Sequence, residues 1–442
     1  NAHSEYTGFR AGLSQNYLFN EQFANTTTVF ASGAATNSSS AAGWSENNPI
    51  NYGFRSAFNF EFEIAPGYEL MGTAGIEAQS QKSHPLSYSM VPDSTNLDGY
   101  NVIGNVRSNT IANTNNWFYF TQWTLAMPHG FSATAGLGVN NTNISLENRL
   151  NMEGENASYE AGYHNLISPH FALNKVFNEH LSLYASYSKA YRTPVSSNIV
   201  IGATGELNTD LRPEEGEQFQ IGSKGDLLGG KLQYQMALFR AEFSNKMTSV
   251  AVALDSVTTA YTYLANSGGQ IDKGLELLVK YRAYHSDVTF LENLHFWGNF
   301  TYSNFNYDDF GYQSIPRGET EVITEIYDGK AVAGVSPVKA NVGMDFSTNN
   351  GFFGNIYYSY KDAMPITSNG KFSTEAFSLL NAKIGFHTHF LDHFDLELFA
   401  GAKNILENQY YTMVFINQLP DAYIPGPTGI NIYEGIDLRY VF

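Results

Sequence analysis

The feature that most constrains the fold is the alternation of short and long connections between the predicted strands. Seventeen runs alternate apolar and polar residues with a period of two, the pattern of β-strands. Every second connection between them is short, as at residues 65–67 and 128–130, whereas most others are long, as at 83–115 and 308–337. Because neighbouring strands of an up-and-down barrel run in opposite directions, this alternation predicts tight turns on one rim and long loops on the other.

The predicted strands have one apolar face and one polar face. Leu232, Tyr234 and Met236 alternate with Gln233 and Gln235. An apolar outer face with a polar inner face is typical of a transmembrane barrel whose lumen is hydrated or filled by a polar plug. Seventeen strands are also too many for one ordinary sandwich. We therefore predict an all-β fold, a transmembrane antiparallel β-barrel with strands near residues 5–18, 22–34, 52–64, 68–82, 116–127, 131–149, 158–176, 181–192, 215–227, 231–253, 261–283, 294–307, 338–347, 352–361, 376–389, 394–406 and 429–442.

Composition fits the barrel and excludes several other classes. Aromatic residues reach 15% while charged residues are only 15%, and no apolar run is long enough for a membrane helix. The chain has no cysteine, so disulfides and thiolate chemistry are excluded. A formal net charge of -18 disfavours nucleic acid as a partner and indicates a solvated, acidic loop surface. Residues 1–6 lack the basic start and apolar core of a signal peptide.

Several motifs carry a resemblance to a known family. The sequence Tyr-Arg-Thr-Pro at residues 191–194 ends one predicted strand, and Leu-Arg-Pro-Glu at residues 211–214 precedes the next. Gly-Leu-Glu opens a strand at residues 274–276, and Asn-Ile-Leu-Glu-Asn at residues 404–408 is followed by a final alternating run that stops on Phe442. In these features the chain resembles the barrel of a TonB-dependent outer-membrane receptor. Residues 51–55 and 77–81 are most similar to ferric siderophore receptors of Bacteroidetes.

The resemblance implies an architecture, a location and a set of partners. A receptor of this family has twenty-two strands around a plug, so residues 1–442 would be the C-terminal part of the barrel, with about seventeen strands and without the plug and the first strands. The implied location is the bacterial outer membrane, with short periplasmic turns and long extracellular loops. The implied partners are outer-membrane lipid and lipopolysaccharide, the TonB energy-transducing complex, and a ferric siderophore or other small ligand.

The seventeen strands leave two edges, near residues 5–18 and 429–442. Inside hydrocarbon each unpaired backbone group costs several kcal/mol, because no water is there to satisfy it. We therefore expect a further segment of about five strands and a globular plug to pair with both edges, either from the same chain or from another one.

The leading function is import of a scarce nutrient, most consistent with a ferric siderophore or similar iron chelate. Two alternatives stay open: a passive porin-like channel, and a TonB-dependent importer of another cargo such as a glycan or a vitamin. An enzyme is disfavoured, because no nucleophile elbow, P-loop or dinucleotide-binding fingerprint is present. Paired acids such as Asp308 and Asp309, or Glu319 and Glu321, are expected to be solvated loop charges.

Four residues are candidates for ligand binding. Arg107, Arg192, Arg317 and Tyr312 are predicted at the extracellular end, where arginines can pair with the carboxylates of an anionic iron chelate. Surface salt bridges or contacts with lipopolysaccharide are the alternative roles.

No cofactor or resident metal is predicted, because a ferric complex brings its own iron ligands. His387, His389 and His393 lie beside a short turn, where cargo would not first arrive. We expect these histidines to be structural or solvated.

Overall fold

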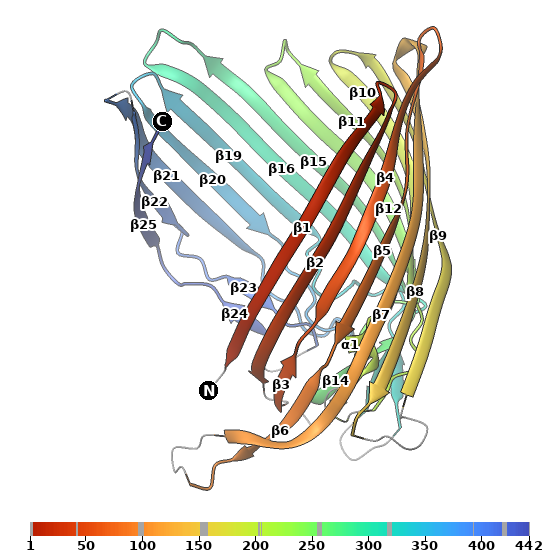
Figure 1. Ribbon diagram of the computed structural model, residues 1–442. Coiled ribbons are helices and arrows are strands. Elements are labelled where there is room, and N and C mark those ends of the chain that lie inside the picture. Colours follow the sequence, from red (N-terminus) through yellow and green to blue (C-terminus); the bar gives the residue numbers. More distant parts are fainter. Residues whose placement is uncertain are drawn as a thin grey trace.

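The molecule is a tall, curved antiparallel sheet rolled into most of a barrel (Figure 1). A computed structural model of the chain describes residues 3–40, 43–95, 101–150, 158–201, 204, 206–253, 259–315, 321–391, 393–417 and 422–441. Within these residues the main sheet has 19 strands, of which β3 and β6 are short extensions beyond the wall. The wall strands are β1 (Ser4–Asn20), β2 (Phe23–Ser40), β4 (Ile50–Ala65), β5 (Tyr68–Ser83), β7 (Asn101–Met127), β8 (Phe131–Asn148), β9 (Ser158–Asn178), β10 (Leu181–Arg192), β11 (Glu214–Leu227), β12 (Leu232–Ser244), β15 (Gly269–His285), β16 (Leu291–Asp308), β19 (Val338–Thr348), β20 (Phe352–Lys361), β21 (Phe377–Phe390), β22 (Phe394–Lys403) and β25 (Asn431–Tyr440).

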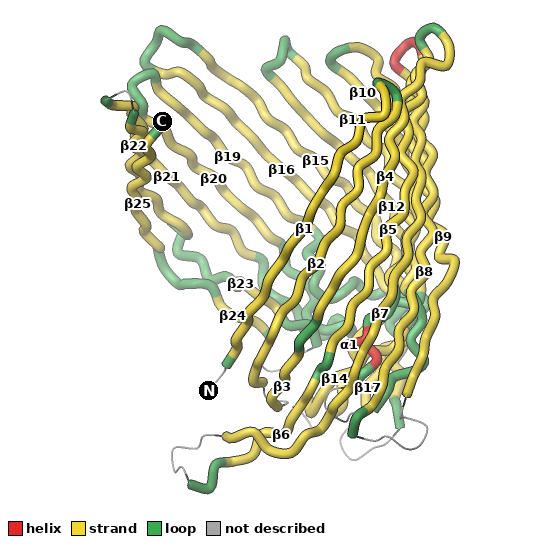
Figure 2. Tube along the Cα trace, viewed as in Figure 1, coloured by secondary structure: helices red, strands yellow, loops and turns green. Residues whose placement is uncertain are grey.

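Each predicted strand corresponds to one wall strand, so the predicted barrel is confirmed. Each described wall strand pairs with its sequence neighbours in antiparallel register, as where Leu181 faces Gly225 and Arg192 faces Glu214 across β10 and β11. Tight turns lie together on one rim and longer connections on the other (Figure 2). At one turn Gly351 has φ 90°, and a Cβ there would approach the carbonyl oxygen of His387 to 2.1 Å, so only glycine fits without rearrangement.

Several predicted boundaries at the loop rim were wrong; the strand predicted at 22–34, for example, continues to Ser40. The predicted strand 231–253 breaks at Asn245, whose φ of 53° ends β12 and starts β13 (Met247–Ala253). The strand 261–283 likewise divides at Gly268, φ 118°, into β14 (Thr259–Asn266) and β15. Residues 83–115, expected to be a loop, contain β6 (Leu86–Pro92) and the start of β7, which form a projecting hairpin. A left-handed residue turns the chain without interrupting its apolar pattern, which explains both missed breaks.

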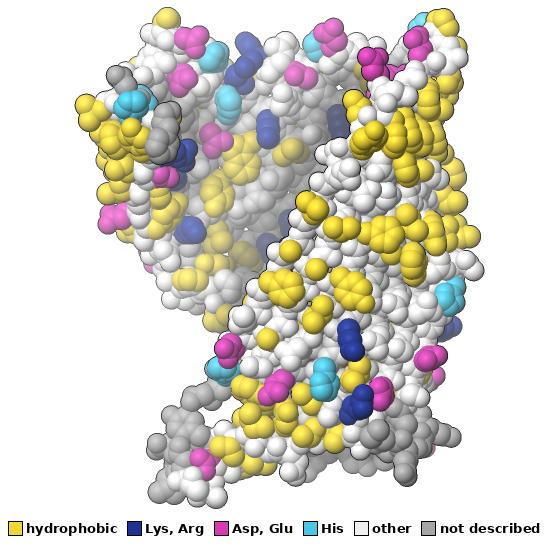
Figure 3. Space-filling view, in the orientation of Figure 1, with side chains coloured by type: hydrophobic (Ala, Val, Ile, Leu, Met, Phe, Trp, Pro, Cys, Tyr) yellow, Lys and Arg dark blue, Asp and Glu magenta, His cyan; other side chains and the backbone are white. Residues whose placement is uncertain are grey.

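The two faces of the wall differ as predicted. Phe219 and Ile221 lie on the outer surface and are each 57% exposed, and residues directly opposite each other across strands share a face. Polar side chains between them, such as Gln220, point to the inside. Apolar side chains cover much of the visible outer wall, with charged ones mainly toward its two ends (Figure 3).

The two outermost strands are separated by an opening. Among the described residues β1 pairs only with β2, and β25 only with β22. Figure 1 shows the wide gap between β1 and β25, through which the inner wall is visible.

The remaining elements lie at the loop rim. They are β6, β13, β14, β3 (Gly43–Asn47), β17 (Gly311–Ile315), β18 (Ile323–Ile326), β23 (Tyr411–Val414), β24 (Tyr423–Pro425) and the one-turn helix α1 (Ser196–Ile199). The 3-10 turn η1 (Pro128–Gly130) lies at the opposite rim, where the tight turns are. Within the described part of the chain, no helix has the length and apolar character needed to span a membrane.

Candidate functional site

A small second sheet lies at the mouth of the barrel, on the loop rim (Figure 2). It has the strand order β14-β13-β17-β18, and its centre is a parallel pairing in which Ala251 faces Ser314 and Val252 faces Ile315. The amide of Gly311 also donates a 2.8 Å hydrogen bond to the carbonyl of Ser267. Two loops from distant parts of the sequence are therefore joined into one platform, called the loop sheet below.

One end of the loop sheet is anchored by an apolar cluster on the inner wall. Ile144 and Leu146 of β8 contact Ile199 of α1, Leu211 and Met247 of β13, and all five are buried. Packing of this kind fixes the connection between β10 and β11 and the start of β13 against the inside of the barrel.

Hydrogen bonds reinforce this first cluster. The hydroxyl of Tyr163 in β9 donates to the carbonyl of Leu211 at 3.0 Å, and that of Tyr159 donates to Thr209 at 3.1 Å. The loop carbonyls removed from water by the packing are therefore satisfied from the wall.

A second cluster, of aromatic residues, anchors the other end. Tyr307 stacks on Phe310 with ring centroids 4.1 Å apart, and Phe310 is 1% exposed. Tyr312 stacks on Tyr327 at 5.6 Å. The amide of Phe310 donates a 2.7 Å hydrogen bond to Asp328, which closes the loop that carries β17 and β18.

Charges surround this aromatic cluster. Tyr327 donates a hydrogen bond to Glu325, and the ammonium of Lys330 lies 4.5 Å from the Tyr327 ring centroid. Burial raises the pKa of Tyr312, and the nearby carboxylate of Glu325 adds to the effect. Burial and the bond to Glu325 also raise the pKa of Tyr327. Both phenols therefore stay protonated at neutral pH and can donate hydrogen bonds.

The structure places one of the four predicted binding residues in the loop sheet and another at the end of a wall strand beside it. Tyr312 lies in β17 of the loop sheet. Arg192 ends β10, is 68% exposed, and pairs with Glu214 at 3.4 Å. Glu214 also accepts a 2.6 Å hydrogen bond from the amide of Met247, at the start of β13. Arg107 is exposed in the β6–β7 hairpin, and Arg317 lies outside the described residues.

Sequence reasoning missed Lys330, Glu325 and Tyr327 as members of the mouth. The strand β18, which contains Glu325, is only four residues long, too short for its alternation to be recognised. The only signal in the sequence was an aromatic residue, Tyr327, with charged residues on both sides.

The inner wall carries its own ion pairs. Arg55 lies 3.6 Å from Glu77 and 4.8 Å from the Phe120 ring centroid. Lys383 lies 3.0 Å from Glu397 and 4.0 Å from the Phe399 ring centroid. A lumen lined in this way is suited to polar contacts and not to a packed apolar core.

The three histidines that the sequence places beside a short turn, His387, His389 and His393, lie at the turn rim. Asp395 is 2.8 Å from His389 and 3.8 Å from His387, and His393 is 3.2 Å from the carbonyl oxygen of Val441. Across the residues that can be placed, no group of three or more histidine or acidic side chains is arranged to hold a metal.

The arrangement of wall, lumen and mouth agrees with comparison to known families. Residues 1–405 match the family described as TonB dependent receptor-like, beta-barrel. The chain belongs to this family. It is a family of transport receptors and not of enzymes, and it is found in the outer membrane of Gram-negative bacteria.

Solved structures share the fold of this TonB-dependent receptor barrel. The ferric citrate transporter FecA is 16% identical with a TM-score of 0.75, and the alignment covers 98% of this chain and 62% of FecA. The siderophore receptor PiuA from Acinetobacter baumannii is 13% identical with a TM-score of 0.76, and the alignment covers 99% of this chain and 65% of PiuA. The copper transporter OprC is 14% identical with a TM-score of 0.70, and the alignment covers 99% of this chain and 65% of OprC. The chain thus spans less than two thirds of each of these proteins. No curated protein matches it in sequence.

Proposed function

We propose that this chain forms most of the wall and the extracellular mouth of a receptor that imports a ferric siderophore or a similar iron chelate across the bacterial outer membrane. The observation that carries the proposal is the loop sheet, anchored at both ends over a lumen with inward-facing ion pairs. A platform of this kind offers a ligand surface at the outer end of a polar passage. The printed descriptions of FecA and PiuA, as ferric citrate transporter and siderophore receptor, support iron as the cargo.

At the mouth, the proposed ligand contacts come from aromatic and basic side chains. Tyr312 supplies a ring and a protonated hydroxyl, and Arg192 keeps guanidinium donors beyond its one contact with Glu214. Arg107 and Arg317 remain proposed contacts. Guanidinium groups suit the carboxylates of an anionic chelate because both groups are planar and pair in two hydrogen bonds.

The same proposal includes the strands that would close the barrel and the plug through which the TonB complex would act. We infer that about five further strands pair with the free edges of β1 and β25 and that a plug occupies the lumen. The support is physical, because an open sheet edge inside hydrocarbon leaves backbone groups unsatisfied. Release of the cargo into the periplasm would then require the TonB complex to move the plug.

The test is uptake by intact cells. Iron-starved cells carrying the full receptor should accumulate a radiolabelled ferric chelate, and deletion of TonB should abolish the accumulation. Uptake that persists without TonB, together with steady ion conductance of the purified protein in planar bilayers, would instead identify a passive porin-like channel.

A second cargo class has a specific observation in its favour. OprC, which is described as a copper transporter, shares the fold at a TM-score of 0.70. Glycans and vitamins are further options within the family. Growth of receptor-deleted cells on limiting iron, limiting copper, or a glycan or vitamin as sole source would separate these cargoes.

A further inference from the structure

Two lysines face the lumen where β19 and β20 end beneath the mouth. Lys339 and Lys361 are direct partners across the two strands, and they are called the lysine pair below. Val342 and Tyr358 are also direct partners, and they are 57% and 38% exposed on the outer wall. Each lysine lies three residues from one of these outer side chains, so both lysines point to the inside. Lys339 is the second residue of β19 and Lys361 the last of β20, which places the pair at the loop rim.

No acid offsets the charge of the lysine pair, although like charges directly opposite each other destabilise a sheet. The inner-face neighbours across and along the strands are uncharged: Thr301, Asn341, Ser359 and Phe377. Neither ammonium forms an ion pair with a carboxylate in the described part of the chain. Asp362, the acid next to Lys361, instead accepts hydrogen bonds from the Tyr360 hydroxyl at 3.2 Å and the Ala363 amide at 2.9 Å.

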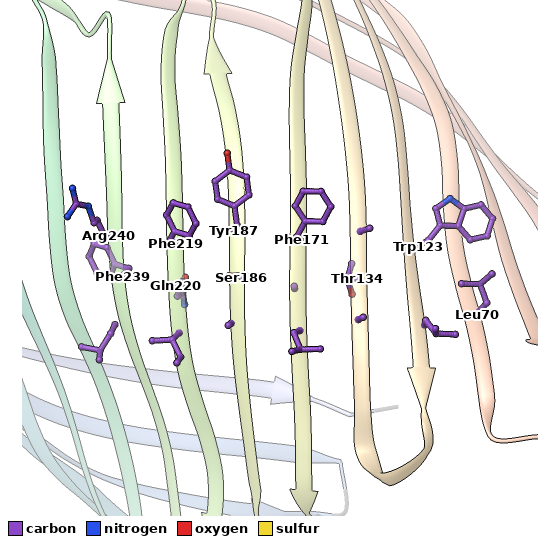
Figure 4. A pocket seen from close by; sticks show the side chains of 18 residues that line it. Leu70, Trp123, Thr134, Phe171, Ser186, Tyr187, Phe219, Gln220, Phe239 and Arg240 are labelled. Carbon is purple, nitrogen blue, oxygen red and sulfur yellow. The ribbon is translucent and has the colours of Figure 1, made fainter.

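Other cations of the wall differ from the lysine pair because they have acidic partners. Arg240 and Lys273 also face each other directly, but on the outer wall, where Arg240 lies at one end of the aromatic row in Figure 4 and is 2.6 Å from Glu242. On the inner wall, Lys383 is 3.0 Å from Glu397. Among the described strand ladders, the lysine pair is the one directly opposed pair of cations without such a carboxylate.

The backbone that carries the lysine pair is held in place by the loops. The hydroxyl of Ser336, which is 1% exposed, lies 3.0 Å from the carbonyl oxygen of Val338 and 2.9 Å from that of Asp362. The amide of Asp362 also donates a 2.9 Å hydrogen bond to the carbonyl of Val338. The ammonium of Lys361 lies 4.7 Å from the ring centroid of Tyr411 in β23. Two adjacent positive charges are therefore positioned before any ligand arrives, which lowers the cost of ordering them on binding.

We propose that Lys339 and Lys361 bind anionic oxygens of the iron chelate beneath the mouth and thereby restrict the cargo to negatively charged complexes. The inference rests on the import function proposed above. A carboxylate or phenolate between the two ammonium groups offsets their mutual repulsion and accepts charge-assisted hydrogen bonds from both. A positively charged chelate or a bare metal cation adds to the repulsion instead and is disfavoured. The lysine pair thus acts as a charge filter at the outer end of the lumen.

The test measures binding of ferric complexes of opposite charge to the purified full receptor by calorimetric titration. Ferric citrate and a ferric tris-catecholate are the anionic probes, and ferrioxamine B is the cationic one. The wild type should prefer an anionic probe, and Lys339→Gln/Lys361→Gln should weaken its binding at least about ten-fold. If the double variant does not fold, Lys339→Gln alone takes its place.

The matched control is Lys280→Gln. Lys280 lies on the inner face opposite Trp297, five residues before β15 ends at the turn rim, so this variant should keep the wild-type affinity. Unchanged affinity in the double variant would overturn the proposal. A wild type that binds neither anionic probe, or that prefers ferrioxamine B, would overturn it as well.

A charge-reversal variant separates a ligand contact from a contact within the receptor. Lys339→Glu places a carboxylate opposite Lys361, so the thermal unfolding temperature without probe should not fall. Binding of the anionic probe should nevertheless become weaker than in the double glutamine variant. A lower unfolding temperature with unchanged probe affinity would overturn the assignment, because it would show that a carboxylate of the plug occupies the lysine pair.

Failure of this inference is distinguishable from failure of the proposed function. TonB-dependent uptake of ferrioxamine B by cells with the wild-type receptor would refute the charge filter and leave import of a ferric chelate intact. Loss of TonB dependence for every ferric complex would instead refute the proposed function.

Discussion

The wall and the mouth of this barrel are stabilised by different forces. Along the wall, successive strands are joined by continuous ladders, while outer side chains such as Phe219 and Ile221 are more than half exposed. At the mouth, side chains are buried as in a water-soluble domain. The largest side chains that are less than 2% exposed are all found near the loop rim: Phe310, Ile144, Ile199, Val250, Asn404, Pro194 and Ser336.

The difference follows from the solvent of each region. Lipid is about as apolar as a leucine side chain, so packing outer side chains together gains little there, and backbone hydrogen bonds must hold the wall. The mouth faces water on both sides, where burial of apolar surface is strongly favourable. Substitutions in the mouth should therefore loosen loops locally, whereas substitutions in the wall should affect insertion of the whole barrel.

The largest effect is expected in the aromatic cluster of the mouth. Phe310→Ala should destabilise the loop sheet by about 4 kcal/mol, as for other buried phenylalanines. Hydrogen exchange of β17 and β18 should then accelerate strongly, while the wall strands stay protected. Phe372→Ala is the control, because that nearby loop phenylalanine is 51% exposed. Accelerated exchange throughout the barrel would show that mouth and wall unfold together.

A slightly smaller effect is expected at Asn404, which joins wall and mouth. Its side chain donates to the carbonyl of Asn408 at 2.9 Å and accepts from the Asn408 amide at 3.0 Å, and its φ is 53°. Asn404→Ala removes these bonds and adds strain from the left-handed backbone, at a total cost of about 3 kcal/mol. Asn404→Gly relieves the strain and should cost clearly less. Hydrogen-exchange rates of the backbone amides of β23 and β24 measure the loss of stability in each variant. Equal losses for Asn404→Ala and Asn404→Gly would contradict the argument from backbone strain.

In the wall, a charge on the lipid face should act through insertion. Leu438 faces Leu396 across β25 and β22 and is 59% exposed. Leu438→Asp or Leu396→Asp should cost up to about 2 kcal/mol, depending on depth. The expected result is less heat-modifiable barrel in outer-membrane fractions, with Leu438→Phe as the apolar control. Wild-type amounts of barrel in the charged variants would place these side chains on the inner face instead.

The regions also differ in how far the sequence predicted them. Alternation identifies the wall strands because one face of each strand must be apolar along the whole membrane span, so that every second residue in the sequence is apolar. The loop sheet depends on a parallel contact between only two residue pairs from distant loops, including Ala251 with Ser314, and such a contact leaves no local period. No local period relates the arginine candidates to the loop sheet either, since Arg192 ends β10 and Arg107 lies in β7, far from it in sequence.

The smallest stability effect, and the sharpest test of the candidate site, concerns Arg192 at the border between the regions. Its partner Glu214 begins β11 of the wall and also holds the first amide of β13 in the mouth. Because Arg192 is largely exposed, Arg192→Ala should lower stability by less than about 1 kcal/mol. If its guanidinium contacts an anionic ferric chelate, the same variant should weaken chelate binding at least ten-fold, and Arg192→Lys should not restore the lost affinity, because an ammonium lacks the planar fork. Thermal unfolding and calorimetric titration of the full receptor measure the two quantities. Unchanged affinity would leave Arg192 as a surface partner of Glu214 and would place the ligand elsewhere on the loop sheet.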